Sequence, residues 1–497
     1  MLNWIWPFSK LNQESRGDSD AWSLSTPLLT FSHGDKYTIG HAVEGTLILG
    51  ATGGGKTSGS GRALLISLLE RNFGGLVLMA KPGDRQELEE YCRKTGRLKD
   101  LAIFGPKGPY RFNPVDFEKN RAGDGAGLTE NLRRLIETME RASDPEGANR
   151  QSSGGNEKFF DDANKQLTRN SIEAVGWGTG HVTIPLLYRF ITSMPRSKSD
   201  LNSREWAEQS FCIRCLADGD KKPKTSQQAE EFENIKDYFF LEWIEFPEKT
   251  QKSIIATFTT AADVLRRGIL RTLFGGETNI DPTAIEQGKI IAVDLPVLEY
   301  GDTGRFAQIL WKYPFQTSIV RRDIGTSPRP VFLWQDEAQL YLIENDYAFQ
   351  SVCRSARVAT VMLSQNVNNF YAVLGGKDAG RPKADSLFGN LKFKVFHCNG
   401  DSTTNTFAAE TIGRQSRFMV SSNQSYQPNT LFAGLNGASV STGISEQIQF
   451  EVEPSVFTGL RTGGPRNKFL VDAIVFFDGM TFKATGRSWR PITFRQK

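Results

Sequence analysis

The sequence predicts an α/β protein with a mainly parallel β-sheet and an inserted all-α domain. Three observations support this prediction. A glycine-rich phosphate-binding motif lies between a strand-like and a helix-like segment, short apolar runs alternate with helical patterns in the first and last parts of the chain, and the stretch between them is charged and helix-patterned. Strands that alternate with helices favour a parallel sheet covered on both faces.

The phosphate-binding motif runs from Gly50 to Thr57 and fits the pattern G-x-x-x-x-G-K-[ST]. An apolar, strand-like run at 46–49 precedes it, and a helix-like run at 63–69 follows. Glycines let backbone N–H groups approach phosphates, and the helix N-terminus favours the same negative charge. Lys56 would contact the β- and γ-phosphates, and the Thr57 hydroxyl would ligate Mg²⁺. We therefore expect ATP to be bound by Gly50, Thr52, Gly53, Gly54, Gly55, Lys56, Thr57 and Ser58.

Residues 1–35 are predicted to form an N-terminal arm or linker, because residues 9–35 are polar and rich in Ser, Asp and Gly. The first eight residues are apolar and aromatic, which leaves two interpretations. They form either an arm packed on the body or on a partner subunit, or a weak membrane foot that uses Trp4 and Trp6. No run of 18 or more apolar residues exists, so we expect no transmembrane helix.

The nucleotide-binding domain is predicted to be discontinuous and to cover residues 36–118 and 270–497. Residues 421–442 are rich in Ser, Asn and Gly and predict a long flexible loop. Residues 469–492 predict a β-hairpin that turns at Asp478-Gly479. Short apolar runs predict the remaining strands of this domain at 46–49, 76–79, 101–104, 289–294, 330–334, 359–363 and 393–397.

Residues 119–269 are predicted to form the inserted all-α domain. The segments 128–141, 159–175 and 228–243 carry apolar residues at helical spacing. Loops of low hydrophobicity, at 143–155 and 218–226, separate them.

An acidic pair is predicted to complete the site, because a carboxylate at the end of a neighbouring strand must hold Mg²⁺ and a second often polarises water. Asp336 and Glu337 follow a strand-like segment, so we assign Asp336 to the metal and Glu337 to the water. Gln335 is unusual, because the residue before the acids is usually apolar. Asp294 also follows an apolar run and is the rival candidate, but Leu295 rather than a glutamate follows it.

Gln365 closes the next strand, where its amide could sense the γ-phosphate and orient water. Arg354 and Arg357 precede that strand, and one of them could reach a neighbouring subunit's nucleotide as an arginine finger. Arg354 is the better candidate. The alternatives are an ordinary strand-end glutamine and solvated arginines. The predicted catalytic residues are thus Lys56, Glu337, Gln365 and Arg354.

Bulk composition limits the function only weakly. The net charge is +4, from 60 basic and 56 acidic residues, which is too near balance to indicate nucleic-acid binding by itself. Five cysteines are too few for a disulfide framework in a chain of 497 residues, which fits a reducing compartment.

In this order, the motifs resemble those of the ATPases that couple DNA processing to type IV secretion. These are the TraG/TraD-type conjugative coupling proteins, relatives of the FtsK/HerA hexameric DNA pumps. The resemblance extends from about residue 45 to the last residues. Besides the phosphate-binding motif, it rests on a Phe-Asn-Pro turn at 111–116, an aromatic helix start at 159–163, a strand ending in Leu-Pro at 290–296, and the segments 336–339, 354–365 and 390–413.

The resemblance implies a RecA-like P-loop NTPase core and an ATP-driven DNA translocase. Such a protein links a DNA or relaxosome substrate to a conjugative transfer channel. The implied partners are single- or double-stranded DNA, relaxosome or secretion-channel proteins, and five further copies of the chain in a homo-hexamer. The implied cofactors are ATP and Mg²⁺.

Two features depart from the family pattern. The loop after the second strand reads Ala80-Lys81-Pro82-Gly83-Asp84 and lacks the first carboxylate of the family's Asp-Pro-Lys-Gly-Asp. The membrane helices that typically begin coupling proteins are not expected here. We therefore expect a cytoplasmic protein, or one that is peripheral at the inner face of the bacterial membrane and relies on a separate membrane partner.

Two other functions fit the same residues. The chain could be a nucleotide-gated module that recruits protein cargo with little hydrolysis, although the intact acidic pair argues against a dead site. It could also be a soluble DNA pump of a mobile element or a defence system.

Overall fold

The computed structural model describes residues 21–121, 123, 125, 127–143, 155–425 and 439–496. Its centre is a nine-stranded sheet in the order β13-β12-β9-β3-β8-β7-β4-β6-β5. The seven strands from β3 to β9 run parallel, and β12 is antiparallel to both of its neighbours. These strands are β3 (Thr46–Leu49), β4 (Gly74–Leu78), β5 (Leu101–Phe104), β6 (Ile290–Val293), β7 (Val331–Gln335), β8 (Val358–Ser364), β9 (Phe393–His397), β12 (Leu470–Phe477) and β13 (Trp489–Arg495). The predicted α/β class and each predicted core strand are confirmed.

Two hydrophobic clusters cover the two faces of this sheet. Successive strand residues point to opposite faces, so Leu76 and Leu78 of β4 lie in one cluster and Val77 lies in the other. The first cluster packs under α16 (Val297–Ile319), and the second packs under α2 (Arg62–Glu70) and α3 (Asp84–Lys94). A third cluster lies under α18 (Val367–Val373), α19 (Gly376–Gly389) and α20 (Ser402–Ile412).

A small antiparallel sheet formed by β1 (Pro27–Thr30) and β2 (Lys36–Thr38) packs on the α2 side of the molecule. Its side chains Leu28, Leu29 and Tyr37 are buried in the second cluster. The prediction of a loose arm up to residue 35 is therefore wrong for the residues of β1, because their apolar side chains find a place on the body. Trp4 and Trp6 lie outside the described residues.

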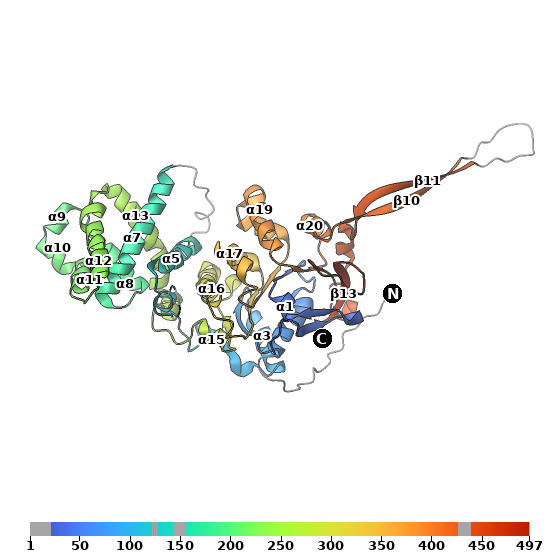
Figure 1. Cartoon of the computed structure of the whole chain (residues 1–497), viewed down its shortest axis with the longest axis horizontal. Helices are drawn as coiled ribbons and strands as arrows, with labels where there is room; N and C mark the ends of the chain where they lie inside the picture. Colours follow the sequence, from blue (N-terminus) through green and yellow to red (C-terminus); the bar gives the residue numbers. More distant parts are fainter. Residues whose placement is uncertain are drawn as a thin grey trace, which may run out of the picture.

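Helices form one end of the molecule, as Figure 1 shows in green and teal. The hydrophobic core of these helices is continuous with the core on one face of the sheet, because Leu167 and Phe190 belong to the same buried cluster as Leu76. The predicted helical segments are confirmed, whereas the domain boundaries at 118 and 270 stay a prediction. The helices are α5 (Thr129–Ser143), α7 (Gly155–Thr179), α8 (Ile184–Thr192), α9 (Lys198–Leu201), α10 (Arg204–Gln209), α11 (Phe211–Asp220), α12 (Ser226–Asp237), α13 (Glu248–Arg266) and α14 (Gly268–Phe274).

Shorter helices connect these layers. They are α1 (Ile39–Ala42), α4 (Pro114–Asn120), α15 (Thr283–Glu286) and α17 (Asn345–Val352). The predicted Phe-Asn-Pro turn starts α4, where the Asn113 side chain accepts hydrogen bonds from the backbone N–H groups of Val115 and Asp116, both at 3.2 Å. Within the part of the chain that the structure describes, no helix is both long enough and apolar enough to cross a bilayer.

A long hairpin forms the end of the molecule opposite the helices (Figure 1). It consists of β10 (Arg414–Ser425) and β11 (Ser439–Phe450), which pair antiparallel along their length. The loop predicted at 421–442 is therefore wrong for residues 421–425 and 439–442. Ser, Gln and Thr are typical of loops, but their backbone N–H and C=O groups can pair between strands as well as those of any other residue. The predicted hairpin at the other end is confirmed in β12 and β13, although its connection spans 478–488 and is closed by a bridge between Phe482 and Arg487.

Candidate nucleotide-binding site

The phosphate-binding loop connects β3 to α2 and is tightly held. The Gly50 N–H donates to the carbonyl oxygen of Ser364 at 3.2 Å, and the Ala51 N–H donates to that of Cys398 at 2.9 Å. Gly55 has φ of 86°, and a Cβ there would lie 2.6 Å from the Val471 side chain. Gly54 is equally confined, since its Cβ would lie 2.8 Å from the Ala51 carbonyl oxygen. Glycine is therefore required at both positions.

The first turn after the loop is a π-helical turn, in which the Gly61 N–H donates to the Lys56 carbonyl oxygen at 2.8 Å. His397 fixes this turn from β9. Its Nδ1 lies 3.1 Å from the Asp472 carbonyl oxygen, which can only accept, so Nδ1 carries the proton. Its Nε2 therefore accepts from the Ser60 hydroxyl at 2.7 Å. Burial lowers the pKa of His397 to about 4, which keeps the ring neutral.

The Ser58 side chain contacts a segment outside the phosphate-binding loop. Its hydroxyl lies 2.7 Å from the Gln496 amide nitrogen, and the Gln496 amide oxygen accepts from the Gly464 N–H, also at 2.7 Å. The Ser58 side chain is thus engaged with the segment after β13, which leaves its backbone N–H for a ligand. Thr52 and Gly53 are exposed at the outer turn of the loop.

The acidic pair meets the phosphate-binding loop at the carboxyl edge of the sheet. The acids do not end a strand next to β3, as the sequence predicted, because β8 lies between β3 and β7. The loop and the acids face each other across this one intervening strand. The Thr57 hydroxyl donates to Asp336 Oδ2 at 3.3 Å, and Lys56 Nζ lies 3.5 Å from Glu337 Oε1. Lys56, Asp336 and Glu337 are buried.

Glu337 is held by two amides. Gln339 Nε2 donates to Glu337 Oε2 at 3.1 Å, while Gln339 Oε1 accepts from the Ser364 hydroxyl at 2.8 Å. Gln365 Nε2 lies 3.5 Å from Glu337 Oε1, at the limit of a hydrogen bond. Burial alone would raise the pKa of Glu337, but Lys56, a hydrogen bond from Gln339 and a second cation lower it below its usual range. The carboxylate is therefore ionised at neutral pH.

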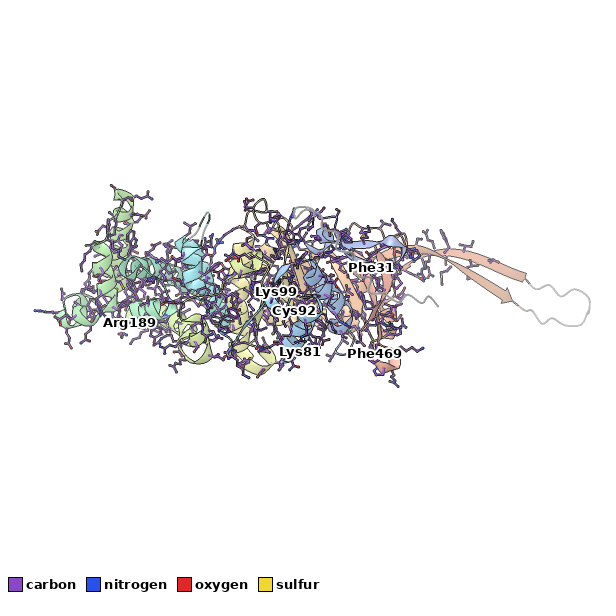
Figure 2. The ribbon with its side chains drawn as sticks, turned by 90° about the horizontal axis from the view of Figure 1, so that it is seen from below. Phe31, Lys81, Cys92, Lys99, Arg189 and Phe469 are labelled. Atoms are coloured by element: carbon purple, nitrogen blue, oxygen red, sulfur yellow. The ribbon has the colours of Figure 1, made fainter. Side chains whose placement is uncertain are left out.

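That second cation is Lys81, which sequence reasoning did not assign to the site. Its Nζ lies 3.5 Å from Asp336 Oδ2 and 3.3 Å from Glu337 Oε1, and these acids raise the pKa of Lys81 against its partial burial. Asp84 closes the loop that presents it by accepting from the N–H groups of Ala80 and Lys81, both at 2.9 Å. Figure 2 labels Lys81 near the middle of the molecule. The sequence signal that could have identified Lys81 was the departure of this loop from the Asp-Pro-Lys-Gly-Asp pattern.

Asp294, the rival acid, and Arg354, the predicted arginine finger, do not lie beside the phosphate-binding loop of their own chain. Asp294 follows β6, two strands beyond β7, and accepts from Arg85 at 2.9 Å. Arg354 precedes β8, whereas Gln365 follows it, so Arg354 lies at the opposite edge of the sheet from its own phosphate-binding loop. It is 66% exposed and pairs with Glu44 at 3.1 Å. Arg357 donates to the Pro328 carbonyl oxygen at 3.1 Å.

The residues at the carboxyl edge fit a nucleotide with Mg²⁺. The glycine-lined loop leaves N–H donors for phosphate oxygens, and the Thr57 and Asp336 oxygens are the hard ligands that Mg²⁺ prefers. In the described residues, no group of three or more His, Cys, Asp or Glu side chains is suited to a metal. Mg²⁺ usually binds through one or two protein oxygens together with substrate phosphates and water.

Comparisons with known proteins give a structural match without a sequence match. No protein-family model and no curated protein matches the chain. The solved structure of the bacterial conjugative coupling protein TrwBdeltaN70, in an unbound form, has a TM-score of 0.58 and 14% identity, covering 94% of this chain and 88% of that one. The plasmid coupling protein TrwB in complex with ADP and Mg²⁺ has a TM-score of 0.57 and 15% identity, with the same coverage. The chain therefore has the fold of the conjugative coupling protein TrwB.

Proposed function

We propose that this protein is an ATP-driven DNA translocase of the conjugative coupling type. The observation that carries the proposal is the meeting of Lys56, Thr57, Asp336 and Glu337 at one edge of the sheet. These side chains come from segments far apart in the sequence and supply the cation, metal ligands and base that phosphoanhydride hydrolysis requires.

Each residue has a role that follows from its position. Lys56 would neutralise the phosphates, and Thr57 with Asp336 would hold Mg²⁺, which supplies positive charge against the phosphate oxygens when bound. Glu337 Oε1 would accept a proton from the attacking water, and the Gln365 amide beside it would orient that water. Gln339 positions Glu337 through its second oxygen. The TrwB complex with ADP and Mg²⁺ supports the choice of nucleotide and ion.

A basic groove supports the DNA half of the proposal. It has a volume of about 1140 Å³ and separates the helical end from α17 and α19. Its floor includes Leu342 to Tyr347, the segment that follows the acidic pair, and one wall includes Val373 and Lys383, which follow Gln365. The groove is thus built on the segments that leave the two catalytic strands. Among its described lining residues, Glu137 and Glu344 are outnumbered by Arg133, Arg134, Arg141, Lys165, Arg305 and Lys383.

A ring of identical copies would complete the site. Arg354 is remote from its own phosphate-binding loop and well exposed, so it is available to a neighbouring copy's nucleotide. A homo-hexamer, relaxosome or channel proteins as partners, and a cytoplasmic location beside a separate membrane partner belong to this proposal.

The test measures ATP hydrolysis by the full chain with and without DNA. Glu337→Gln should lower turnover by about 10²–10⁴-fold while a fluorescent ATP analogue still binds, because the amide cannot accept the proton. Lys56→Ala should lose nucleotide binding itself. Glu205→Gln, at an exposed glutamate of α10 in the helical end, is the control. Undiminished turnover in Glu337→Gln would sink the assignment, and hydrolysis that DNA does not stimulate would favour the cargo-recruitment alternative.

A further inference from the structure

The hairpin of β10 and β11, here called the arm, stands away from the body of the molecule (Figure 1). Twelve residue pairs join its strands, from Arg414 with Phe450 to Ser425 with Ser439. At the usual rise per strand residue, the arm is about 40 Å long. It is long enough to reach across the surface of another subunit.

One face of the arm is apolar. Residues paired across two strands share a face, and neighbours along a strand alternate. The pairs Ser416–Ile448, Phe418–Glu446 and Val420–Ile444 therefore lie on one face, and Arg417–Gln447 and Met419–Ser445 lie on the other. The apolar face of the arm consists of Phe418, Val420, Ile444 and Ile448, which are 71%, 67%, 71% and 72% exposed.

An exposed apolar face on a two-stranded hairpin is stabilised when a partner covers it. A two-stranded ribbon is at best marginally stable alone in water, because neither face is packed. Burying each of its four large apolar side chains would contribute about 1.5–3 kcal/mol. Ser416 and Glu446 share this face and Met419 lies on the opposite one, but the large apolar side chains are concentrated on the face of Phe418, which indicates a surface that packs against a partner.

Both strands of the arm are anchored beside the phosphate-binding loop. β10 follows α20, which starts just after Asn399, and the Asn399 side chain donates to the Gln365 carbonyl oxygen at 2.8 Å. β11 leads into the turn at Pro454–Gly459, where the Phe457 carbonyl oxygen accepts from the Asn399 N–H at 3.3 Å. The neighbouring Cys398 contacts the loop through Ala51. One short segment, 398–399, therefore contacts the phosphate-binding loop, the end of β8 and the turn that follows β11.

We propose that the arm clasps a second copy of this chain, with its apolar face laid on that copy's body. The inference rests on the proposed function, in which a neighbouring copy must supply Arg354. The described part of the arm carries only Arg414, Arg417 and Glu446 as charged residues, so it does not complement the phosphates of a nucleic acid. One face of a ribbon about 40 Å by 10 Å is about half of the roughly 800 Å² that each partner contributes to a stable interface. Contacts around the nucleotide would supply the rest.

The test compares two sets of substitutions in the full chain. Phe418→Thr, Val420→Thr and Ile444→Thr remove three of the four large side chains of the apolar face but keep residues that favour strands. Met419→Thr with Gln447→Thr changes the opposite face and is the matched control. Sedimentation velocity with a non-hydrolysable ATP analogue should show assembly of the wild type and the control. The triple variant should need at least tenfold more protein to assemble, while each copy still binds the analogue.

A photo-crosslinking residue gives an independent measurement. Placed at position 418, it should link two copies of the chain and double the mass, whereas at position 419 it should not. Wild-type assembly of the triple variant, or links at 418 only within one copy, would overturn the inference and leave the proposed function standing. Loss of binding to phosphatidylglycerol vesicles without loss of assembly would overturn it in favour of a lipid surface. An absence of ATP hydrolysis in the wild type would remove the proposed function, while assembly would still be measured.

Discussion

The ammonium group of Lys81 lies between the two carboxylates that we assign to the metal and the water. In the absence of nucleotide, Mg²⁺ has to compete with this fixed charge for Asp336. Lys81→Met should therefore increase the Mg²⁺ affinity of the nucleotide-free protein by about tenfold, a modest value because the side chain is 40% exposed and screened by solvent. Calorimetric titration with Mg²⁺ measures this change. Lys81→Arg keeps the charge and should stay near the wild type, and an unchanged affinity of the Met variant would contradict the competition.

The buried ring of His397 makes stability depend on pH. Its pKa is about 4 in the folded chain and about 6.5 in an unfolded one, so the unfolded state binds more protons between these values. The stabilisation is complete above pH 6.5 and is lost as the pH falls towards 4. Between pH 7 and pH 5, the wild type should lose about 2 kcal/mol more unfolding free energy than His397→Gln. Urea unfolding at both pH values tests this, with His181→Gln, at an exposed histidine, as the control.

At the residue scale, the sequence predicts the parts of the site that have a motif and misses those that depend on strand order. The glycines, Lys56 and Thr57 follow from one contiguous pattern. Lys81 and His397 do not, because only the placing of β4 beside β7 and of β9 beside β3 brings their side chains to the site. No periodicity in a single sequence gives the order of strands in a parallel sheet.

A buried ion pair fixes the segment after the acidic pair to α16. Lys312 Nζ lies 2.7 Å from Asp346 Oδ2 and 3.0 Å from the Tyr341 carbonyl oxygen, with the Lys312 side chain wholly buried. Burial lowers the pKa of Lys312, and Asp346 opposes that shift. Lys312→Met should reduce the free energy of unfolding by about 3–5 kcal/mol, because Asp346 would be left without its counter-charge.

Urea unfolding measures this cost, and an exposed pair is the control. Lys252 and Glu248 of α13 are 2.6 Å apart but mostly in solvent, so Lys252→Met should cost less than about 0.5 kcal/mol. Equal costs in the two variants would show that the Lys312 pair does not hold the segment.

At the element scale, apolar runs predict buried strands well, and polar strands are missed. Strands such as β4 and β6 are buried along their whole length and are therefore continuously apolar. β10 and β11 are Ser- and Gln-rich, and their apolar face becomes visible only when the register pairs Val420 with Ile444. The first strand pair was missed for a related reason, since Pro27–Thr30 is too short to show an alternation.

The whole molecule is nearly neutral, yet basic residues outnumber acidic ones among the described residues that line the groove. Arg134→Ala, Lys165→Ala and Lys383→Ala together should weaken DNA binding. The slope of the logarithm of the binding constant against the logarithm of salt concentration should become shallower, by an amount equivalent to about two to three phosphate contacts. Fluorescence anisotropy of a labelled oligonucleotide across a range of salt concentrations measures both effects. The exposed Lys198, Arg204 and Lys221 of the helical end provide a matched triple Ala control. Equal salt slopes in the two variants would place the DNA elsewhere.

At the scale of the whole chain, the sequence predicts the class of fold but not its assembly. The distance in sequence between Lys56 and Asp336 is explained by the helical block, which the charged and helix-patterned stretch predicts. The groove could not be predicted, because it is formed by α5, α16 and α19 together. Neither could the direction of the arm, since the residues of β10 and β11 give no sign of where the body lies.

The place of β3 in the sheet has a consequence for how the protein is made. Thr46 of β3 pairs with Val361 on one side and with Phe393 on the other, and both follow the whole helical block in the chain. The phosphate-binding motif therefore leaves the ribosome long before either of its neighbouring strands. The helical block, with its local contacts, can fold in the meantime. We expect a nascent chain to acquire ATP binding only after β9 has emerged, so binding of nucleotide would mark a late stage of synthesis although its motif is among the first parts translated.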